Sequence, residues 1–230
     1  MLFDLDGVLI DSCEVHVRSW IEVFRPYGVE LEPEWLNLQE GRRSMEIARA
    51  IVAEHNLRID EAELSQLIER KRAFYRAHAP HGMRPDARIA VEELKNRGYA
   101  VGLVSGSVRD NMSSVLETKE QELFDVLITA EDYSRGKPDP EPYLIACQRL
   151  GLEPQSCIAV ENAPLGIDSA KAAGMRVVAL TSTLTEDKLR KAEEKIDGLT
   201  ALPQMLGTPC VSPLRGRRGE KGIKGGGASS

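Results

Sequence analysis

Residues 1–12 of the chain read MLFDLDGVLIDS, in which a short apolar run meets two acidic residues, Asp4 and Asp6. The apolar run, Met1–Leu5, is typical of a buried parallel strand. Ligands of open α/β sheets bind at the carboxyl edge of the strands, and the two acids stand at that point of the sequence. Gly7 lets the chain turn sharply after them. The stretch therefore predicts a strand that delivers two carboxylates to a ligand-binding edge.

Four more apolar runs follow, each short and each succeeded by polar or glycine-containing residues. They are Tyr99–Val104, Phe124–Thr129, Cys157–Val160 and Arg176–Leu180. Helical periodicity fills the intervals between and after them, at Asp86–Arg97, Val108–Glu117, Glu141–Leu150, Leu165–Ala173 and Glu186–Lys195. This alternation predicts an α/β fold in which a parallel sheet carries helices on both faces.

Residues 14–83 break the alternation, because they carry helical stripes and no convincing strand. One stripe consists of Val17, Trp20, Ile21 and Phe24, and others run along 45–55 and 64–75. An insertion of this length is too long for a loop. We therefore expect a core domain of residues 1–13 and 84–206, interrupted by a small helical domain of residues 14–83.

Composition excludes several classes of protein. Hydrophobic residues make up 42% and charged residues 29% of the 230 residues, as in ordinary globular proteins. The net charge of −6 makes nucleic acid a poor partner. No apolar run has the length needed to span a membrane. Residues 207–230 are rich in glycine, serine and basic residues and lack hydrophobic periodicity, so we expect a disordered basic tail.

The four cysteines show no C-x-x-C spacing, which indicates reduced thiols in an intracellular protein. The first residues also lack the basic start and unbroken apolar stretch of a secretory signal. We expect a cytoplasmic protein that is a monomer and acts away from membranes.

The acids after the first strand admit two interpretations. A carboxylate at this edge can be a nucleophile towards phosphorus, and a second acid beside it can move protons. Alternatively, Asp4 and Asp6 only cap a helix or form a turn.

The sequence Ser105-Gly106-Ser107 follows the second strand, where a hydroxyl and exposed N–H groups before a helix suit a phosphate. The alternative there is that Ser107 only caps that helix.

Two further sites follow later strands. Lys137 lies in GKPDP (136–140), either as a cation held in a stiff loop or as a solvated loop lysine. Glu161 and Asn162 follow the run Cys157–Val160 and suit a hard cation such as Mg²⁺, or they cap the next helix. Because all these groups fall at carboxyl ends of predicted strands, we expect them to converge. Together they supply what phosphoryl transfer requires.

At this point the chain resembles a known family, the haloacid dehalogenase superfamily. The motifs are DLDGVLIDS (4–12), VSGS (104–107), GKPDP (136–140) and VENAPLGIDSAKAAGM (160–175). Their order and spacing agree with the family over residues 1 to about 205. The resemblance implies a Rossmann-like, doubly wound core with an inserted α-helical cap.

The resemblance also implies roles for the core residues. Asp4 would attack phosphorus to form an aspartyl-phosphate, and Asp6 would protonate the leaving oxygen and then activate water. Ser105, Gly106 and Lys137 would bind the phosphate. An acid at position 6 indicates phosphate chemistry, because the dehalogenase branch lacks one there.

By the same resemblance, Mg²⁺ would be held by Asp4, the backbone carbonyl of Asp6, Glu161 and Asn162. Many relatives have aspartate where this chain has Asn162. The amide still offers an oxygen but no charge, so we expect weaker Mg²⁺ affinity without loss of the site.

The inserted region resembles the cap of the branch that includes β-phosphoglucomutase and small sugar-phosphate phosphatases. His16 and Lys71 match substrate-contacting residues there, and Gly41-Arg42-Arg43-Ser44 resembles its specificity loop. We assign His16, Arg43 and Lys71 to the substrate. Alternatively, His16 lies on a helix surface and Lys71 lays its methylenes along the apolar stripe.

We therefore expect a Mg²⁺-dependent phosphatase of small phosphorylated metabolites, most of all sugar phosphates. One alternative is a hexose-phosphate mutase of the β-phosphoglucomutase type. Another is a non-catalytic protein that binds phosphorylated ligands.

Overall fold

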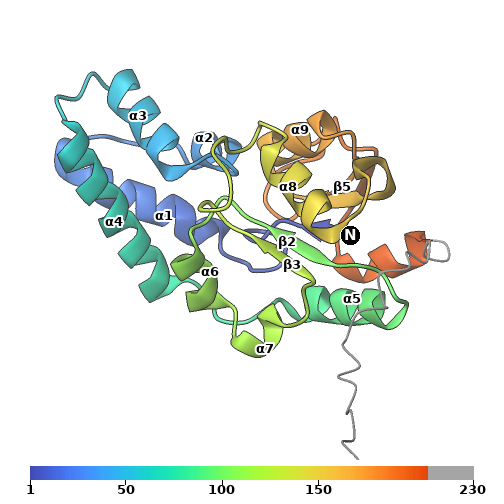
Figure 1. Ribbon diagram of the computed structural model, residues 1–230. Helices are drawn as coiled ribbons and strands as arrows, with labels where there is room; N and C mark the ends of the chain where they lie inside the picture. Colours follow the sequence, from blue (N-terminus) through green and yellow to red (C-terminus); the bar gives the residue numbers. More distant parts are fainter. Residues whose placement is uncertain (207–230) are drawn as a thin grey trace, which may run out of the picture.

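The computed structural model describes residues 1–206, and the predicted tail lies outside this range (Figure 1). Six parallel strands form one sheet in the order β3-β2-β1-β4-β5-β6. Their bounds are Leu2–Phe3 (β1), Gly102–Val104 (β2), Val126–Ile128 (β3), Ile158–Glu161 (β4), Arg176–Leu180 (β5) and Glu194–Ile196 (β6). The prediction of a parallel α/β sheet is confirmed.

The central strand β1 shows how the two faces of the sheet are covered. Successive side chains of a strand point to opposite faces. Phe3 packs into one hydrophobic cluster with α5 (Pro85–Asn96), whereas Leu2 packs into another with α8 (Glu141–Leu150) and α9 (Pro164–Ala172). Helices therefore lie on both sides, as Figure 1 shows, and the fold is doubly wound.

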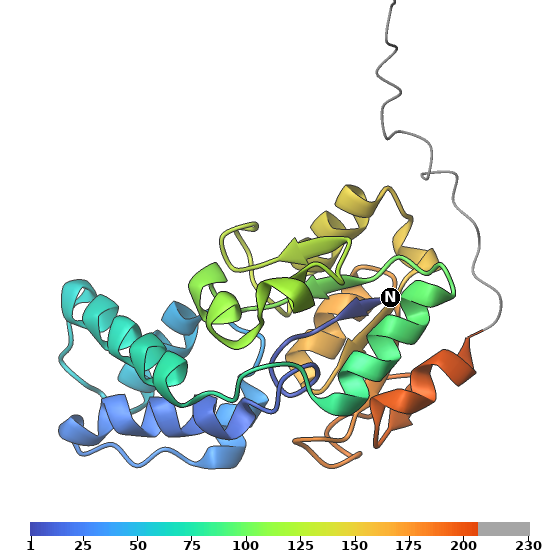
Figure 2. The ribbon, with the colours of Figure 1, turned by 90° about the horizontal axis from the view of Figure 1, so that it is seen from below.

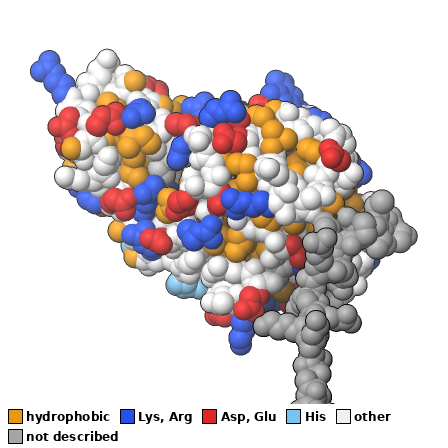
Figure 3. All heavy atoms as spheres, in the orientation of Figure 1, with side chains coloured by type: hydrophobic (Ala, Val, Ile, Leu, Met, Phe, Trp, Pro, Cys, Tyr) orange, Lys and Arg blue, Asp and Glu red, His pale blue; other side chains and the backbone are white. Residues whose placement is uncertain are grey.

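The remaining core elements are short. They are α6 (Arg109–Val115), α7 (Thr118–Gln121) and the 3-10 helices η2 (Pro154–Ser156) and η3 (Leu199–Met205). Of these, η3 packs along α5 on the Phe3 side of the sheet. Basic and acidic side chains are interspersed over the face seen in Figure 3.

Helices alone make up the inserted region. They are α1 (Cys13–Phe24), η1 (Arg25–Tyr27), α2 (Pro33–Leu38), α3 (Ser44–Glu54) and α4 (Glu61–His78). The predicted stripes meet in a hydrophobic cluster of their own, which includes Trp20, Phe24, Ile51 and Leu67. Figure 2 shows these helices to one side of the sheet. On this separation we propose the division into a cap (14–83) and a core (1–13 and 84–206).

One predicted helix is wrong. Residues 186–195 were expected to be helical, but they form turns that lead into the short strand β6. The segment is rich in helix-forming charged residues, yet only Leu189 and Ala192 are buried apolar residues within it. A helix with only two buried apolar residues would have a small apolar face, and most helical stability in proteins comes from packing such a face.

Two smaller expectations concern the cysteines and membranes. Cys13, Cys147 and Cys157 are free and buried, whereas Cys210 lies outside the described residues. Within residues 1–206, no helix combines the length and the hydrophobicity needed to cross a bilayer.

Candidate active site

Lys137 joins two carboxylates at the carboxyl edge of the sheet. It is fully buried, and its Nζ donates to Asp4 Oδ1 and to Glu161 Oε1, both at 2.6 Å, and to the carbonyl of Val104 at 3.1 Å. Asp4 continues the ladder of β1, because its N–H donates to the carbonyl of Val160 at 3.0 Å. Three predicted site residues from distant parts of the sequence therefore meet, and Lys137 is no solvated loop lysine.

Lys137 partly offsets the charge of the two carboxylates beside it. Burial lowers the pKa of Lys137, but the adjacent Asp4 and Glu161 outweigh burial and raise it well above its ordinary value. Burial raises the pKa of Asp4 well above its ordinary value, and Lys137 lowers it without outweighing burial. A buried carboxylate keeps its charge only beside a compensating cation. Asp4 therefore depends on Lys137 for its ionised form.

Asp6 accepts hydrogen bonds from both core and cap. Ser12 and Tyr75 donate to its Oδ1 at 2.6 and 2.7 Å, Ser107 donates to its Oδ2 at 3.0 Å, and His16 Nε2 lies 2.9 Å from Oδ1. Burial raises the pKa of Asp6, but the charge of His16 and these hydrogen bonds outweigh it and hold the pKa below its usual range. Asp6 is therefore ionised in this conformation.

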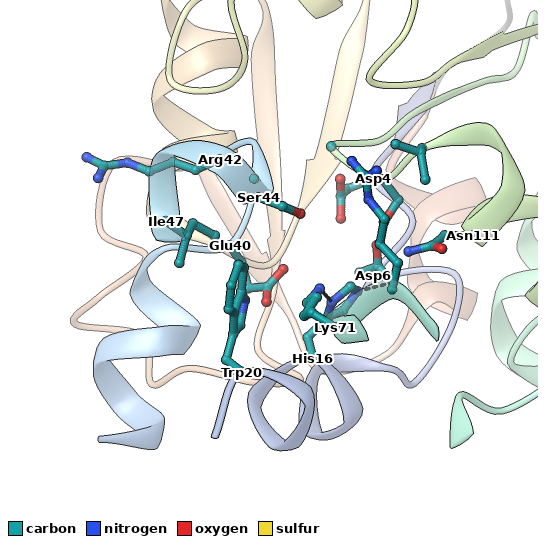
Figure 4. A pocket seen from close by; sticks show the side chains of 15 residues that line it. Asp4, Asp6, His16, Trp20, Glu40, Arg42, Ser44, Ile47, Lys71 and Asn111 are labelled. Carbon is teal, nitrogen blue, oxygen red and sulfur yellow. Dashed lines mark hydrogen bonds and ion pairs between the residues drawn. The ribbon is translucent and has the colours of Figure 1, made fainter. Parts of the chain in front are cut away.

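The cap residues assigned to the substrate partly reach this centre. Lys71 on α4 approaches His16 on α1, with Nζ and Nδ1 2.6 Å apart, and Lys71 also lies over the ring of Trp20. Burial lowers the pKa of Lys71 to about 8. A chain of contacts thus runs from Lys71 through His16 to Asp6 (Figure 4). Neither residue is a surface side chain, since both are buried.

A pocket opens between the cap and the carboxyl edge of the sheet. Residues of both parts line it: Asp4, Asp6, His16, Trp20, Glu40, Gly41, Arg42, Ser44, Ile47, Lys71, Arg72, Gly106, Ser107, Val108 and Asn111. Sequence reasoning missed Glu40 and Asn111, because neither follows a strand or belongs to a motif. In Figure 4 the carboxylate of Glu40 points into the pocket.

The loop after β2 presents Gly106 and Ser107 to the pocket, whereas Ser105 is not one of the residues that line it. Ser105 is buried, and its Oγ accepts a hydrogen bond of 3.0 Å from the N–H of Ser107. The helix that follows is capped by Val108, so the alternative of a capping serine at Ser107 is wrong. That hydroxyl instead donates to Asp6.

Arg43 does not reach the pocket, and its assignment to the substrate has to be corrected. Its guanidinium donates to the carbonyl of Ser134 at 2.7 Å and to that of Ala130 at 3.4 Å, and lies over the ring of Tyr133. Arg43 precedes the first turn of α3 and is directed towards the core loop. Arg42 lines the pocket instead, but its guanidinium extends away from Asp4 and Asp6 (Figure 4).

The predicted Mg²⁺ ligands offer oxygen atoms only. Asn162 donates through Nδ2 to Thr183 at 3.2 Å and to the sulfur of Cys13 at 3.5 Å, which leaves its amide oxygen for a ligand role. Within residues 1–206 no three acidic, histidine or cysteine side chains gather around a common metal position. A site here therefore needs a backbone carbonyl and this amide besides carboxylates. Hard oxygen donors of this kind fit Mg²⁺.

Glycines let the backbone pass close to the predicted Mg²⁺ ligands Asn162 and Glu161. A side chain at Gly7 would meet the amide nitrogen of Asn162 at 2.1 Å, and one at Gly166 would meet the carboxylate of Glu161 at 2.2 Å. Gly7 also has a φ of 80°, which glycine adopts without strain. Asn162 therefore packs against the turn that carries Asp6.

Comparison with known proteins agrees with this geometry. The model of the family described as haloacid dehalogenase-like hydrolase matches residues 1–180. Validoxylamine A 7'-phosphate phosphatase of Streptomyces hygroscopicus subsp. limoneus is 36% identical over 202 residues, which cover 86% of this chain and 93% of that protein. Hexitol phosphatase A of Escherichia coli (strain K12) is 30% identical over 194 residues, or 84% and 87% of the two chains.

Solved structures support the fold. The crystal structure of β-phosphoglucomutase from Clostridium difficile superposes with a TM-score of 0.76 at 24% identity. The match covers 87% of this chain and 91% of that one. The likeness therefore extends over the sheet and the inserted helices together.

Proposed function

The chain belongs to the haloacid dehalogenase-like hydrolases and is a phosphoric monoester hydrolase, and from this we propose that it hydrolyses sugar or polyol phosphates with Asp4 as nucleophile. The observation that carries the proposal is the 2.6 Å contact of Lys137 with Asp4, at the edge where Asp6 also lies. The substrate class follows the names of the two relatives above, a validoxylamine phosphate phosphatase and a hexitol phosphatase.

In the first half of the reaction, a carboxylate oxygen of Asp4 forms a bond to phosphorus and the bond to the leaving alcohol breaks. Asp6 supplies the proton that the alcohol oxygen takes up. Water then attacks the aspartyl-phosphate, Asp6 takes its proton, and Asp4 is released with inorganic phosphate. The hydrogen bonds to Asp6 favour its carboxylate, which is the form that the second half requires. Protonation for the first half requires that some of them are given up.

The chain's remaining groups hold the phosphate and balance charge. Lys137 offsets the charge of Asp4, and the N–H groups around Gly106 offer donors before α6. Asp4, the carbonyl of Asp6, Glu161 and Asn162 would hold Mg²⁺. When bound, the ion would offset the negative charge on the phosphoryl oxygens.

Hydrolysis is favoured over a mutase reaction by the two arginines of the cap loop. A mutase must hold a bisphosphorylated intermediate in two orientations, so its cap needs a firm second phosphate site. Arg43 is engaged by the core loop, and the guanidinium of Arg42 points away from the catalytic acids. Neither supplies such a site.

One experiment tests both points. The protein is incubated with Mg²⁺ and a panel of sugar and polyol phosphates, and free phosphate is measured. One arm contains β-glucose 1-phosphate with a catalytic amount of the 1,6-bisphosphate, and glucose 6-phosphate is followed as well. We expect phosphate release from several monophosphates. Glucose 6-phosphate appearing much faster than phosphate would establish the mutase, and no release from any substrate would favour a binding protein.

A further inference from the structure

Glu40 is an acid in a pocket that has to accept a phosphate dianion. It belongs to the cap loop between α2 and α3, and its carboxylate points towards the centre of the pocket, opposite Asp4 (Figure 4). The residue as a whole is half-buried, but burial around its carboxyl group raises its pKa. A carboxylate in this position costs free energy unless the substrate offers it a partner.

Two cations of the cap wall, Lys71 and Arg72, are engaged within the protein. Lys71 contacts His16 and has Glu40 as the nearby acid that does most to favour its charged form. Arg72 forms an ion pair with Glu69 on the same helix. Arg43 is bound to the core loop, and Arg42, which lines the pocket, extends its guanidinium away from the catalytic acids. Neither arginine therefore faces a second anion placed beside Glu40.

We propose that Glu40 makes the pocket selective for phosphomonoesters whose remaining part carries hydroxyl donors and no second anionic group. Hydroxyls of a sugar or polyol donate to the Glu40 carboxylate, and this replaces the water that it loses on binding. A second phosphate or a carboxylate in the same place faces a like charge. Rejection by like charge is a common source of specificity. The inference rests on the proposed function and specifies its substrate class.

Other polar groups of the pocket suit a hydroxyl-bearing substrate. Asn111 lines the wall on the core side, and its Oδ1 accepts a hydrogen bond of 3.0 Å from Arg76, so its Nδ2 is directed elsewhere. Ser44 points into the pocket from the first turn of α3 (Figure 4). Both are neutral donors, one on each side of the pocket, so they suit hydroxyl groups without favouring a second anion.

The test compares one sugar with and without a second phosphate. Values of kcat/KM are measured for fructose 1-phosphate and fructose 1,6-bisphosphate with the wild type, Glu40→Gln and Glu46→Gln. Glu46 is the matched control, because it is an exposed acid two residues into α3. We expect the wild type to prefer the monophosphate. Glu40→Gln should raise the bisphosphate-to-monophosphate ratio by about tenfold, since a like-charge contact in a partly solvated pocket is removed, and Glu46→Gln should leave it unchanged.

An unchanged ratio in folded Glu40→Gln, or a wild-type preference for the bisphosphate, would overturn the proposal. Calorimetric titration with the same two sugars in the absence of divalent cations gives the ratio of binding constants without turnover. Titration therefore decides on Glu40 even if no phosphate is released, an outcome that would count against the proposed function alone.

Discussion

Tyr75 on the cap helix α4 donates a hydrogen bond of 2.7 Å to Asp6, in the loop that follows the core strand β1. Burial raises the pKa of Asp6, and this hydrogen bond acts with the charge of His16 and the hydrogen bonds of His16 and Ser12 to hold the pKa below its usual range. The cap therefore acts directly on the proton-carrying group of the core.

Replacing Tyr75 by phenylalanine should raise the pKa of Asp6, because a donor to its charged form is lost. The limb of the pH–rate profile that reports Asp6 then moves to higher pH. Tyr27→Phe is the control, because the Tyr27 hydroxyl donates to Glu63, which lies on α4 like Tyr75 but does not line the pocket. Identical profiles for the wild type and Tyr75→Phe would contradict a role for this hydrogen bond.

Asp4→Asn should lower phosphate release by at least roughly a thousandfold, because an amide is no nucleophile towards phosphorus. Asparagine is nearly isosteric, and Lys137 keeps its second partner Glu161, so the fold should persist. Phosphate release and circular dichroism are measured together. A folded variant with wild-type turnover would refute the proposed mechanism.

Activity should require a divalent cation, with Mg²⁺ preferred over softer metals, since the proposed ligands are all oxygen. Asn162→Asp adds a charge to the ligand set and should lower the half-saturating Mg²⁺ concentration several-fold. Asn111→Asp is the control, because Asn111 lines the pocket without being a proposed ligand. A half-saturating concentration that stays the same or rises in Asn162→Asp would exclude Asn162 from the ligand set.

Arg43→Ala should lower kcat/KM by roughly tenfold for all substrates alike, because two hydrogen bonds to backbone carbonyls of the core loop are lost. The loop that carries Glu40 would then close less firmly on the core. Arg42→Ala should have a smaller effect, since its guanidinium points away from the catalytic acids. If Arg42→Ala were the more damaging change, Arg42 would have to contact the substrate.

Lys71 gives the protein a pH-dependent stability. Burial lowers its pKa to about 8 from an ordinary 10.5. Between these values the unfolded chain keeps a proton that the folded chain has released, so a rising pH stabilises the fold by up to about 1.4 kcal/mol per unit. Below this window the ammonium is charged in both states, and the full cost of burying it remains. Relative to Lys71→Met, the wild type should gain stability across this window in denaturant titrations, whereas a constant difference would refute the shift.

The catalytic edge was predictable because its residues follow strands. Asp4, Lys137 and Glu161 each stand after an apolar run or in a proline-bounded loop, and parallel strands bring such positions together. Tyr75 was predicted only as part of an apolar stripe. Its hydroxyl contact with Asp6 depends on how the cap docks, which helical periodicity does not determine.

The cap loop shows most clearly what could not be predicted from the sequence. A rotation about a few backbone bonds decides whether Arg42, Arg43 or Glu40 faces the pocket, and no periodic pattern constrains a loop. Similarly, the segment 186–195 has the composition of a helix, but the short pairing of β5 with β6 determines its structure. Pairing of this kind depends on the neighbouring strand, and the three residues of β6 are too few to show a strand pattern in the sequence.

The position of β1 in the sheet has a consequence for synthesis on the ribosome. Leu2 pairs with Gly102 on one side and with Ala159 on the other. At roughly 5–20 residues per second, both partners emerge many seconds after β1 itself. The cap helices are contiguous in sequence and form local contacts, so they can assemble before the partner strands of β1 have been synthesised. The nascent chain then carries an apolar, unpaired first strand, and the contact of Asp4 with Val160 forms only once β4 has been made.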